Sequence, residues 1–79
     1  MKELLEHLAR GLVERPEAVR VTELREGDGS IVLELSVADD DYGKVIGRGG
    51  RTAAALRTVV KFAAARTGRR VFVDIVDAA

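Results

Sequence analysis

The sequence predicts an α+β domain in which three helices pack on one face of a three-stranded mixed sheet. Three observations support this prediction. The first is a leucine stripe at helical spacing near the N-terminus, and the second is a pair of segments that alternate apolar and polar residues around a glycine-containing turn. The third is a glycine-bounded turn between two further helix-forming segments. No linker, repeat or low-complexity tract interrupts them, so we expect one domain over residues 1–79.

The first three elements are expected to be a helix and a β-hairpin. Residues 2–14 place leucines at helical spacing, and the pattern stops before the only proline, Pro16. Residues 18–24 and 31–38 alternate apolar with polar side chains, which is typical of strands. Residues 27–30 between them read Gly-Asp-Gly-Ser, a composition that accepts a tight turn.

Three aspartates, Asp39, Asp40 and Asp41, precede a short helix expected over residues 41–46. A carboxylate at this position accepts hydrogen bonds from the free amides of a helix start, so we expect these residues to cap the helix. A divalent-metal site is the alternative. Adjacent carboxylates point in different directions, which makes capping the better interpretation.

The last two elements are a long helix and a strand. Residues 51–66 are mostly good helix formers, and Leu56, Val60, Ala63 and Thr67 recur on one side. Gly68 is expected to end this helix, and residues 71–76 then alternate as a third strand. The connection through two helices allows this strand to run parallel to the second one.

Charge is divided unevenly along the chain, although the formal net charge is zero. Residues 43–73 contain eight basic side chains and no acidic one, and all thirteen acidic residues lie elsewhere. The basic residues of this segment are Lys44, Arg48, Arg51, Arg57, Lys61, Arg66, Arg69 and Arg70. Such asymmetry indicates a surface for a polyanion, and nucleic acid is the leading partner.

Residues 45–51 read Val-Ile-Gly-Arg-Gly-Gly-Arg and form the glycine-bounded turn. Gly47 and Gly50 have no Cβ, so a sugar-phosphate chain can approach the backbone closely. The amides and the dipole at the start of the next helix favour a phosphate at the same place. Arg48 within the turn, with Lys44 and Arg51 beside it, supplies positive charge.

This turn resembles the GxxG signature of KH domains, because Val45, Ile46, Gly47 and Gly50 match its V-I-G-x-x-G form. The expected element order, α-β-β-α-α-β, resembles the type II KH arrangement, so the resemblance covers nearly all of the chain. In its length, its aspartate run and its arginine-rich helix, the chain is similar to the KhpA family of small bacterial RNA-binding proteins. It departs from the KH pattern at Ala53, where a large aliphatic residue is usual.

The resemblance implies that the GxxG loop clamps about four nucleotides of single-stranded RNA, or of single-stranded DNA. It places the bases in a groove between the helices that flank the loop and the last strand. Residues 67–70 would be the variable loop. The implied RNA-binding residues are Lys44, Val45, Ile46, Gly47, Arg48, Gly49, Gly50, Arg51, Arg69 and Arg70.

The resemblance also implies a biological setting. It indicates a cytoplasmic post-transcriptional regulator or RNA chaperone linked to cell elongation and division. It further implies a dimer, formed with a second copy or with a KH protein of the Jag (KhpB) type. The alternative function is a protein-interaction module that serves as a heterodimer subunit, with its arginine face paired to an acidic partner.

Enzymatic chemistry finds no support in the sequence. The chain has no cysteine and one histidine, His7, which has no serine or cysteine near it in sequence. We therefore expect no catalytic residue, no cofactor and no metal. No segment is long and apolar enough to span a bilayer, and Glu3 and Glu6 argue against a signal peptide, so no membrane partner is expected.

Phe62 falls on the side of the long helix away from its apolar stripe, near Arg66. Two explanations stay open. Long arginine stems cover the ring, or the ring belongs to a self-association surface. We expect Phe62 and Arg66 to mark the dimer interface if the second explanation holds.

Overall fold

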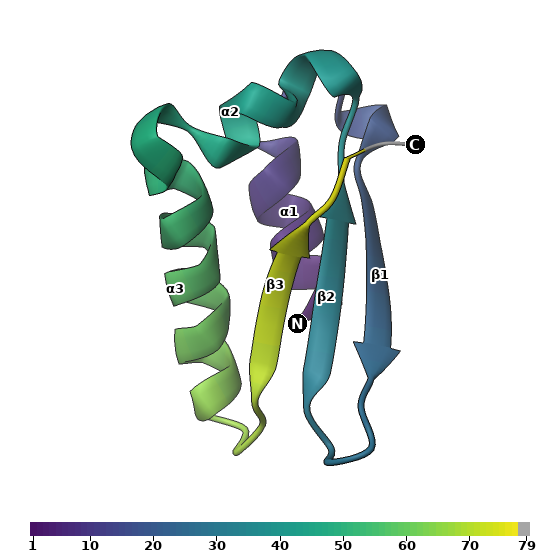
Figure 1. Cartoon of the computed structure of the whole chain (residues 1–79), viewed down its shortest axis with the longest axis vertical. Coiled ribbons are helices and arrows are strands. Elements are labelled where there is room, and N and C mark those ends of the chain that lie inside the picture. The colour runs from purple at the N-terminus through teal and green to yellow at the C-terminus, as the bar shows by residue number, and fades with distance from the viewer. Residues whose placement is uncertain (78–79) are drawn as a thin grey trace.

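A computed structural model describes residues 1–77 of the chain. Its helices and strands are α1 (Lys2–Arg10), β1 (Arg20–Arg25), β2 (Ile31–Ser36), α2 (Tyr42–Ile46), α3 (Arg51–Ala65) and β3 (Val71–Ile75). Single 3₁₀ turns lie at Pro16–Ala18, Asp39–Asp41 and Arg48–Gly50. The predicted α+β class and the order of the helices and strands are confirmed (Figure 1).

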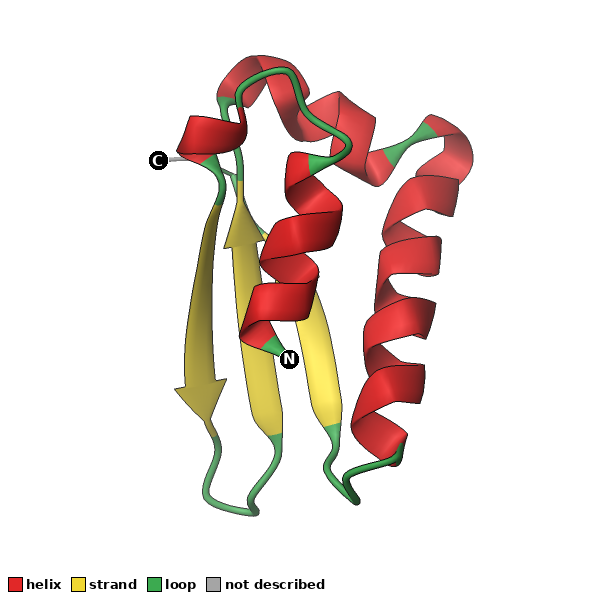
Figure 2. Ribbon diagram, turned by 180° about the vertical axis from the view of Figure 1, so that it is seen from behind, coloured by secondary structure: helices red, strands yellow, loops and turns green. Residues whose placement is uncertain are grey.

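The sheet has the order β1-β2-β3. β1 and β2 form an antiparallel hairpin in which Val21 faces Leu35. β2 and β3 are parallel, with Leu33 beside Val73, which confirms the predicted crossover through two helices. The helices lie on one face of the sheet, with α1 across it and α3 along the side of β3 (Figure 2). β3 is therefore an edge strand.

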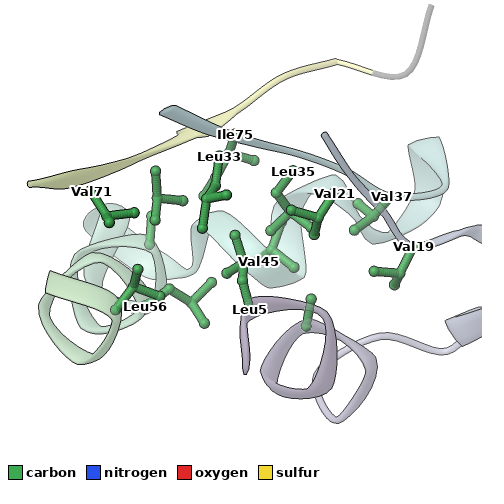
Figure 3. Close-up of a cluster of buried hydrophobic side chains, with 14 of the residues drawn as sticks. Leu5, Val19, Val21, Leu33, Leu35, Val37, Val45, Leu56, Val71 and Ile75 are labelled. Atoms are coloured by element: carbon green, nitrogen blue, oxygen red, sulfur yellow. The ribbon is translucent and has the colours of Figure 1, made fainter. Parts of the chain in front are cut away.

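The core lies between the sheet and the three helices (Figure 3). Leu33 and Leu35 of β2, Leu5 of α1, Val45 of α2 and Val60 of α3 are all 0% exposed. Burial of one such side chain stabilises the fold by about 1.5–3 kcal/mol. Because each helix contributes to the same core, α2 and α3 are held at a fixed angle, and the turn between them is held with them.

The first helix is shorter than the predicted range 2–14, because it ends at Arg10. Gly11 is a poor helix former. The amides of Glu14 and Arg15, which a longer helix would have used, instead donate to the carboxylate of Asp41. This tertiary contact outweighs the local pattern. The 3₁₀ turn at Pro16–Ala18 then delays the start of β1 to Arg20.

The buried stripe of α3 also differs from the predicted one. The buried residues of this helix are Ala53, Leu56, Val60 and Ala64. Ala63 is only partly buried, and Thr67 lies beyond the helix and is exposed. Alanines at both ends of the stripe let the helix approach the sheet closely, although their hydrophobicity is low. Gly68 has a φ of 75°, as expected where the chain turns toward β3.

None of the helices within residues 1–77 has the length and apolar character needed to cross a bilayer.

Candidate nucleic-acid interface

The turn between α2 and α3 is built from residues 47–50. Gly47, Gly49 and Gly50 have φ angles of 77°, 64° and 78°. Residues other than glycine rarely adopt a positive φ angle. The turn therefore depends on glycine at three of its four positions. Arg48 is the one residue of the turn that has a side chain.

The three glycines have different surroundings. A Cβ on Gly47 would collide with the Thr52 side chain and would lie 2.8 Å from the Thr52 backbone nitrogen. Gly47 therefore allows the turn to pack tightly against the first turn of α3. A Cβ on Gly49 or Gly50 would meet no atom within 4 Å. The outer side of the turn is open, so another chain can approach its backbone.

The tip of this turn presents hydrogen-bond donors. The amide of Gly50 donates to the carbonyl of Gly47 at 3.1 Å, which closes the turn. The amides of Arg48 and Gly49 have no backbone acceptor within residues 1–77, and both residues are exposed. Arg51 opens α3 directly behind them. Free amides at the positive end of a helix, next to two guanidinium groups, suit an anion such as phosphate.

Most cations of the basic segment have no carboxylate partner. Of its eight basic residues, only Lys44 and Arg70 form ion pairs among residues 1–77. The other six are Arg48, Arg51, Arg57, Lys61, Arg66 and Arg69. Because the acidic residues do not neutralise these six, the charge asymmetry seen in the sequence persists on the folded surface.

Asp41 does not cap its own helix, which corrects the capping prediction. Its side chain is 1% exposed and accepts hydrogen bonds from the amides of Glu14 at 3.2 Å and Arg15 at 3.1 Å. Lys44 places its Nζ 3.2 Å from Asp41 Oδ1 and 3.1 Å from Glu14 Oε1. Asp41 therefore ties the segment after α1 to the start of α2.

The charges in this cluster stabilise one another. Burial disfavours the ionised carboxylate of Asp41, but the amides of Glu14 and Arg15 and the Lys44 ammonium outweigh it and lower the pKa of Asp41. Hydrogen bonds to Glu14 and then to Asp41 raise the pKa of Lys44. Both shifts favour the charged forms of Asp41 and Lys44.

The structure brings together only part of the residue set expected to bind RNA. Residues 46–51 surround the turn, and Lys44 lies nearby but between two carboxylates. Val45 is 0% exposed, so it holds α2 in the core and offers no surface to a ligand. Arg69 and Arg70 lie past the other end of α3, about 20 Å from the turn at 1.5 Å per helical residue. Arg70 is paired with Asp28 at 2.9 Å.

Two residues make contacts that the sequence did not predict. The first is Asp41, whose partners Glu14 and Arg15 are 27 and 26 residues away, so no local pattern reveals the contact. The second is Arg57 of α3, whose Nε donates to the carbonyl of Val73 in β3 at 3.2 Å. Its spacing from Lys61, one helical turn later, is the signal that places both on the same flank.

The exposed side of α3 carries Phe62, which is 74% exposed, and Arg66, which is also exposed. Arginine stems therefore do not cover the ring. Within residues 1–77, no cluster of three or more histidine, cysteine or acidic side chains is arranged to hold a metal ion.

Known proteins resemble this chain over nearly its whole length. The model of the family "KhpA/KhpB, KH domain" matches residues 2–75. The RNA-binding protein KhpA of Halalkalibacterium halodurans is 56% identical over 77 residues, which cover 98% of this chain and all of the relative. The protein of the same name from Clostridium acetobutylicum is 53% identical over 76 residues, which cover 96% of this chain and all of the relative.

Solved structures show the same fold. The chain superposes on Aquifex aeolicus Era bound to GDP and AlF4⁻ with a TM-score of 0.67 and 21% identity. Era in complex with MgGDPNP and nucleotides 1506–1542 of 16S ribosomal RNA gives the same values. Each superposition covers 96% of this chain and 29% of the Era chain. With its GxxG turn, type II element order and full-length relatives, the chain belongs to the KhpA/KhpB KH-domain family.

Proposed function

We propose that this chain binds single-stranded RNA through the turn at residues 47–50, without catalysis. The observation that favours this function most is the open outer side of the turn, where Gly49 and Gly50 leave the backbone uncovered and Arg48 projects beside free amides. A phosphodiester strand can approach such a surface without meeting a Cβ. The names of the full-length relatives, RNA-binding protein KhpA, point to the same ligand.

The residues around the turn have separable roles in this proposal. Arg48 and Arg51 contact phosphates, because both are exposed and have no carboxylate partner among residues 1–77. Ile46, which is partly buried against the core, offers an apolar surface to a base. Lys44 binds a phosphate only if its ion pair with Glu14 breaks. Val45 does not contact RNA but anchors α2 in the core.

The test is a variant that reverses the charge of the turn. Arg48→Asp with Gly49→Asp replaces a cation and an open backbone position by two carboxylates. We expect retention of a 12-nucleotide single-stranded RNA to be lost while circular dichroism stays unchanged, because Asp tolerates the left-handed backbone that Gly49 adopts. The matched control is Arg25→Asp with Gly27→Asp. It makes the same change in charge at the hairpin turn, where a Cβ on Gly27 meets no atom within 4 Å.

The outcome decides the assignment clearly. Loss of RNA in the first variant and retention in the control support a clamp at the turn. Equal loss in both variants would show that only total charge matters. Unchanged retention in the first variant would show that the clamp lies elsewhere.

We also propose that α3 mediates self-association. Val59 and Phe62 are 45% and 74% exposed, and Arg66 continues the same side of the helix one turn later. Leu12, 40% exposed, adds to this apolar area, and an apolar groove of about 200 Å³ separates it from Val59. Two weak RNA sites held together gain effective concentration on one RNA, which gives a small domain a reason to pair.

This pairing, with a second copy or with a Jag/KhpB-type KH protein, completes the role that we propose. The chain acts in the cytoplasm as a post-transcriptional regulator or RNA chaperone, linked to cell elongation and division. The exposed Phe62 also favours the second candidate, an adaptor that binds a protein partner and little RNA. Nuclease treatment before copurification distinguishes them, since it strips the partners of an RNA binder and spares those of an adaptor.

A further inference from the structure

We propose that the open face of the sheet docks a basic amphipathic helix of another protein. The helices lie on one face of the sheet, and among residues 1–77 none covers the other face, which is turned toward the viewer in Figure 1. The side chains of this open face alternate with the buried ones. They are Arg20, Thr22 and Leu24 of β1, Val32, Glu34 and Ser36 of β2, and Phe72 and Asp74 of β3.

An apolar row crosses the open face from strand to strand. Leu24 is the register partner of Val32, and Val32 is the register partner of Phe72. Leu24 is 42% exposed and Phe72 is 47% exposed, while Val32 between them is partly buried. Because neighbouring strands lie about 4.8 Å apart, the three side chains form one continuous strip. Contiguous apolar side chains on a surface are typical of an interaction site.

Two carboxylates lie beside the apolar row. Glu34 and Asp74 are partners in the parallel register, two residues along the strands from the row. Like charges at facing positions repel and destabilise a sheet. Neither carboxylate forms an ion pair within residues 1–77. The fold therefore carries a repulsion that a cation from another molecule would relieve.

The cations of this chain do not supply that charge. Arg20 on the open face donates to the carbonyls of Glu17 and Val19, at 2.9 Å each. Arg70 at the edge of the face pairs with Asp28 at 2.9 Å. A second copy packed through the same face therefore brings no unpartnered cation to the two carboxylates. RNA is disfavoured as well, because its phosphates would meet like charge. A basic protein segment is the occupant that the charges favour.

The spacing of the apolar row and the carboxylates indicates the shape of the partner. Residues two apart along a strand are separated by about 6.6–6.8 Å. Residues four apart on a helix are separated by about 6 Å along its axis. A helix along the strands therefore places an apolar side chain on the row and a Lys or Arg, one turn later, beside the carboxylates. It also covers the second face of the sheet, as helices do in layered α/β folds.

The probe is a synthetic helical peptide of three heptads, with leucine at positions a and d, lysine at e and g, and alanine elsewhere. A second peptide has glutamate in place of lysine. Each is titrated into the isotope-labelled protein, whose mass of 8.5 kDa suits amide NMR. We expect the lysine peptide to shift the amides around Glu34 and Asp74 and to leave those of residues 47–51 unchanged. The glutamate peptide should shift neither group.

Removal of the two carboxylates tests the charge complementarity. Glu34→Gln with Asp74→Asn keeps the shape of both side chains, and loss of two partly exposed ion pairs corresponds to about 2- to 30-fold weaker binding of the lysine peptide. The matched control is Glu3→Gln with Glu6→Gln, which removes the same charge from α1 on the other side of the sheet (Figure 2). We expect the control to bind the peptide as the wild type does. Retention of the twelve-nucleotide RNA should not change in either variant.

Two further measurements separate docking from a structural role. Because Glu34 and Asp74 repel each other, we expect Glu34→Gln with Asp74→Asn to raise the midpoint of urea unfolding while it weakens peptide binding. A pair that served the fold would lower the midpoint when it is removed. Leu24→Ser should also weaken peptide binding, whereas Leu24→Met, which keeps an apolar side chain, should bind as the wild type does.

The other outcomes would overturn the proposal. Equal weakening in the Glu3 and Glu6 control would show that net charge alone attracts the peptide. Binding of the glutamate peptide, or amide shifts confined to α3 and the turn, would place the contact elsewhere. A change in the sedimentation of Leu24→Glu alone would assign the open face to a second copy of the chain. If the wild type binds neither peptide, the docking surface is wrong, and RNA binding by the turn stands or falls separately on its own test.

Discussion

Replacement of Gly47 by alanine is expected to destabilise the fold far more than the same change at Gly49. Gly47 has φ 77° and ψ 169°, a region that is essentially restricted to glycine and costs about 1–3 kcal/mol for other residues. The new methyl group would also collide with the Thr52 side chain and lie 2.8 Å from its backbone nitrogen. Overpacking of this kind adds about 1–3 kcal/mol. The expected total is about 2–6 kcal/mol.

Gly49→Ala and Gly50→Ala are the matched controls. Both positions have positive φ, but an added Cβ meets no atom within 4 Å. Only the cost of left-handed backbone applies, which is about 1–2 kcal/mol. The total stability of a domain of 79 residues is about 4–12 kcal/mol, so Gly47→Ala removes a large share of it and the controls do not.

The assay is urea unfolding followed by circular dichroism, with the free energy of unfolding extrapolated to water. A double-mutant cycle with Thr52→Gly isolates the part of the clash that involves the Thr52 side chain, because this change removes those atoms and keeps the backbone nitrogen. We expect the double variant to lose less stability than the sum of the two single variants. If Gly47→Ala is no less stable than Gly49→Ala, the close approach to Thr52 does not limit this position. If the cycle shows no coupling, the Thr52 side chain does not contribute to the clash.

Two further predictions concern the acidic cluster and the exposed side of α3. The folded state lowers the pKa of Asp41 below its ordinary value of 3.8, so its contribution to stability is present above that pH and is lost as the pH falls through the lowered value. We therefore expect the difference in the free energy of unfolding between the wild type and Asp41→Asn to shrink below about pH 4, when unfolding is measured over a range of acidic pH. A difference that does not change with pH would contradict the charged contact. Phe62→Glu is expected to sediment as a monomer at concentrations where the wild type associates, whereas Leu24→Glu, on the other face of the sheet, keeps the wild-type state. An unchanged oligomer in Phe62→Glu would exclude α3 as the interface.

Local patterns predicted the helices and strands well where buried side chains recur at the spacing typical of a helix or a strand. Val71, Val73 and Ile75 alternate with exposed residues as a strand requires, and the structure buries all three. The same alternation places Phe72 on the outside. Prediction failed where a contact between distant segments decided the outcome. The end of α1 is set by the bonds from Glu14 and Arg15 to Asp41, and these partners are too far apart in sequence for a local pattern to show them.

The site was predicted in part for the same reason. The glycines of the turn are a local signal, since each of the three has a backbone conformation that glycine favours. Val45 was predicted to bind RNA because it belongs to the motif, but a valine at such a position can face either the ligand or the core. The structure places it in the core at 0% exposure. Arg69 and Arg70 follow the turn by about twenty residues, and only the length of α3 shows how far away they lie.

The acidic half of the chain explains how a protein of zero net charge can present a cationic surface. Its carboxylates pair with only a few of the cations of the basic segment. Glu14 and Asp41 hold Lys44, and Asp28 holds Arg70, which leaves six cations of that segment without a carboxylate partner among residues 1–77. Of these six, Arg48 lies in the turn and Arg51 opens α3 directly after it. Arg57 and Lys61 lie farther along α3, and Arg66 and Arg69 follow its end. Because unpaired cations release counterions when they meet phosphates, RNA affinity should depend on this subset and hardly on the net charge of the chain.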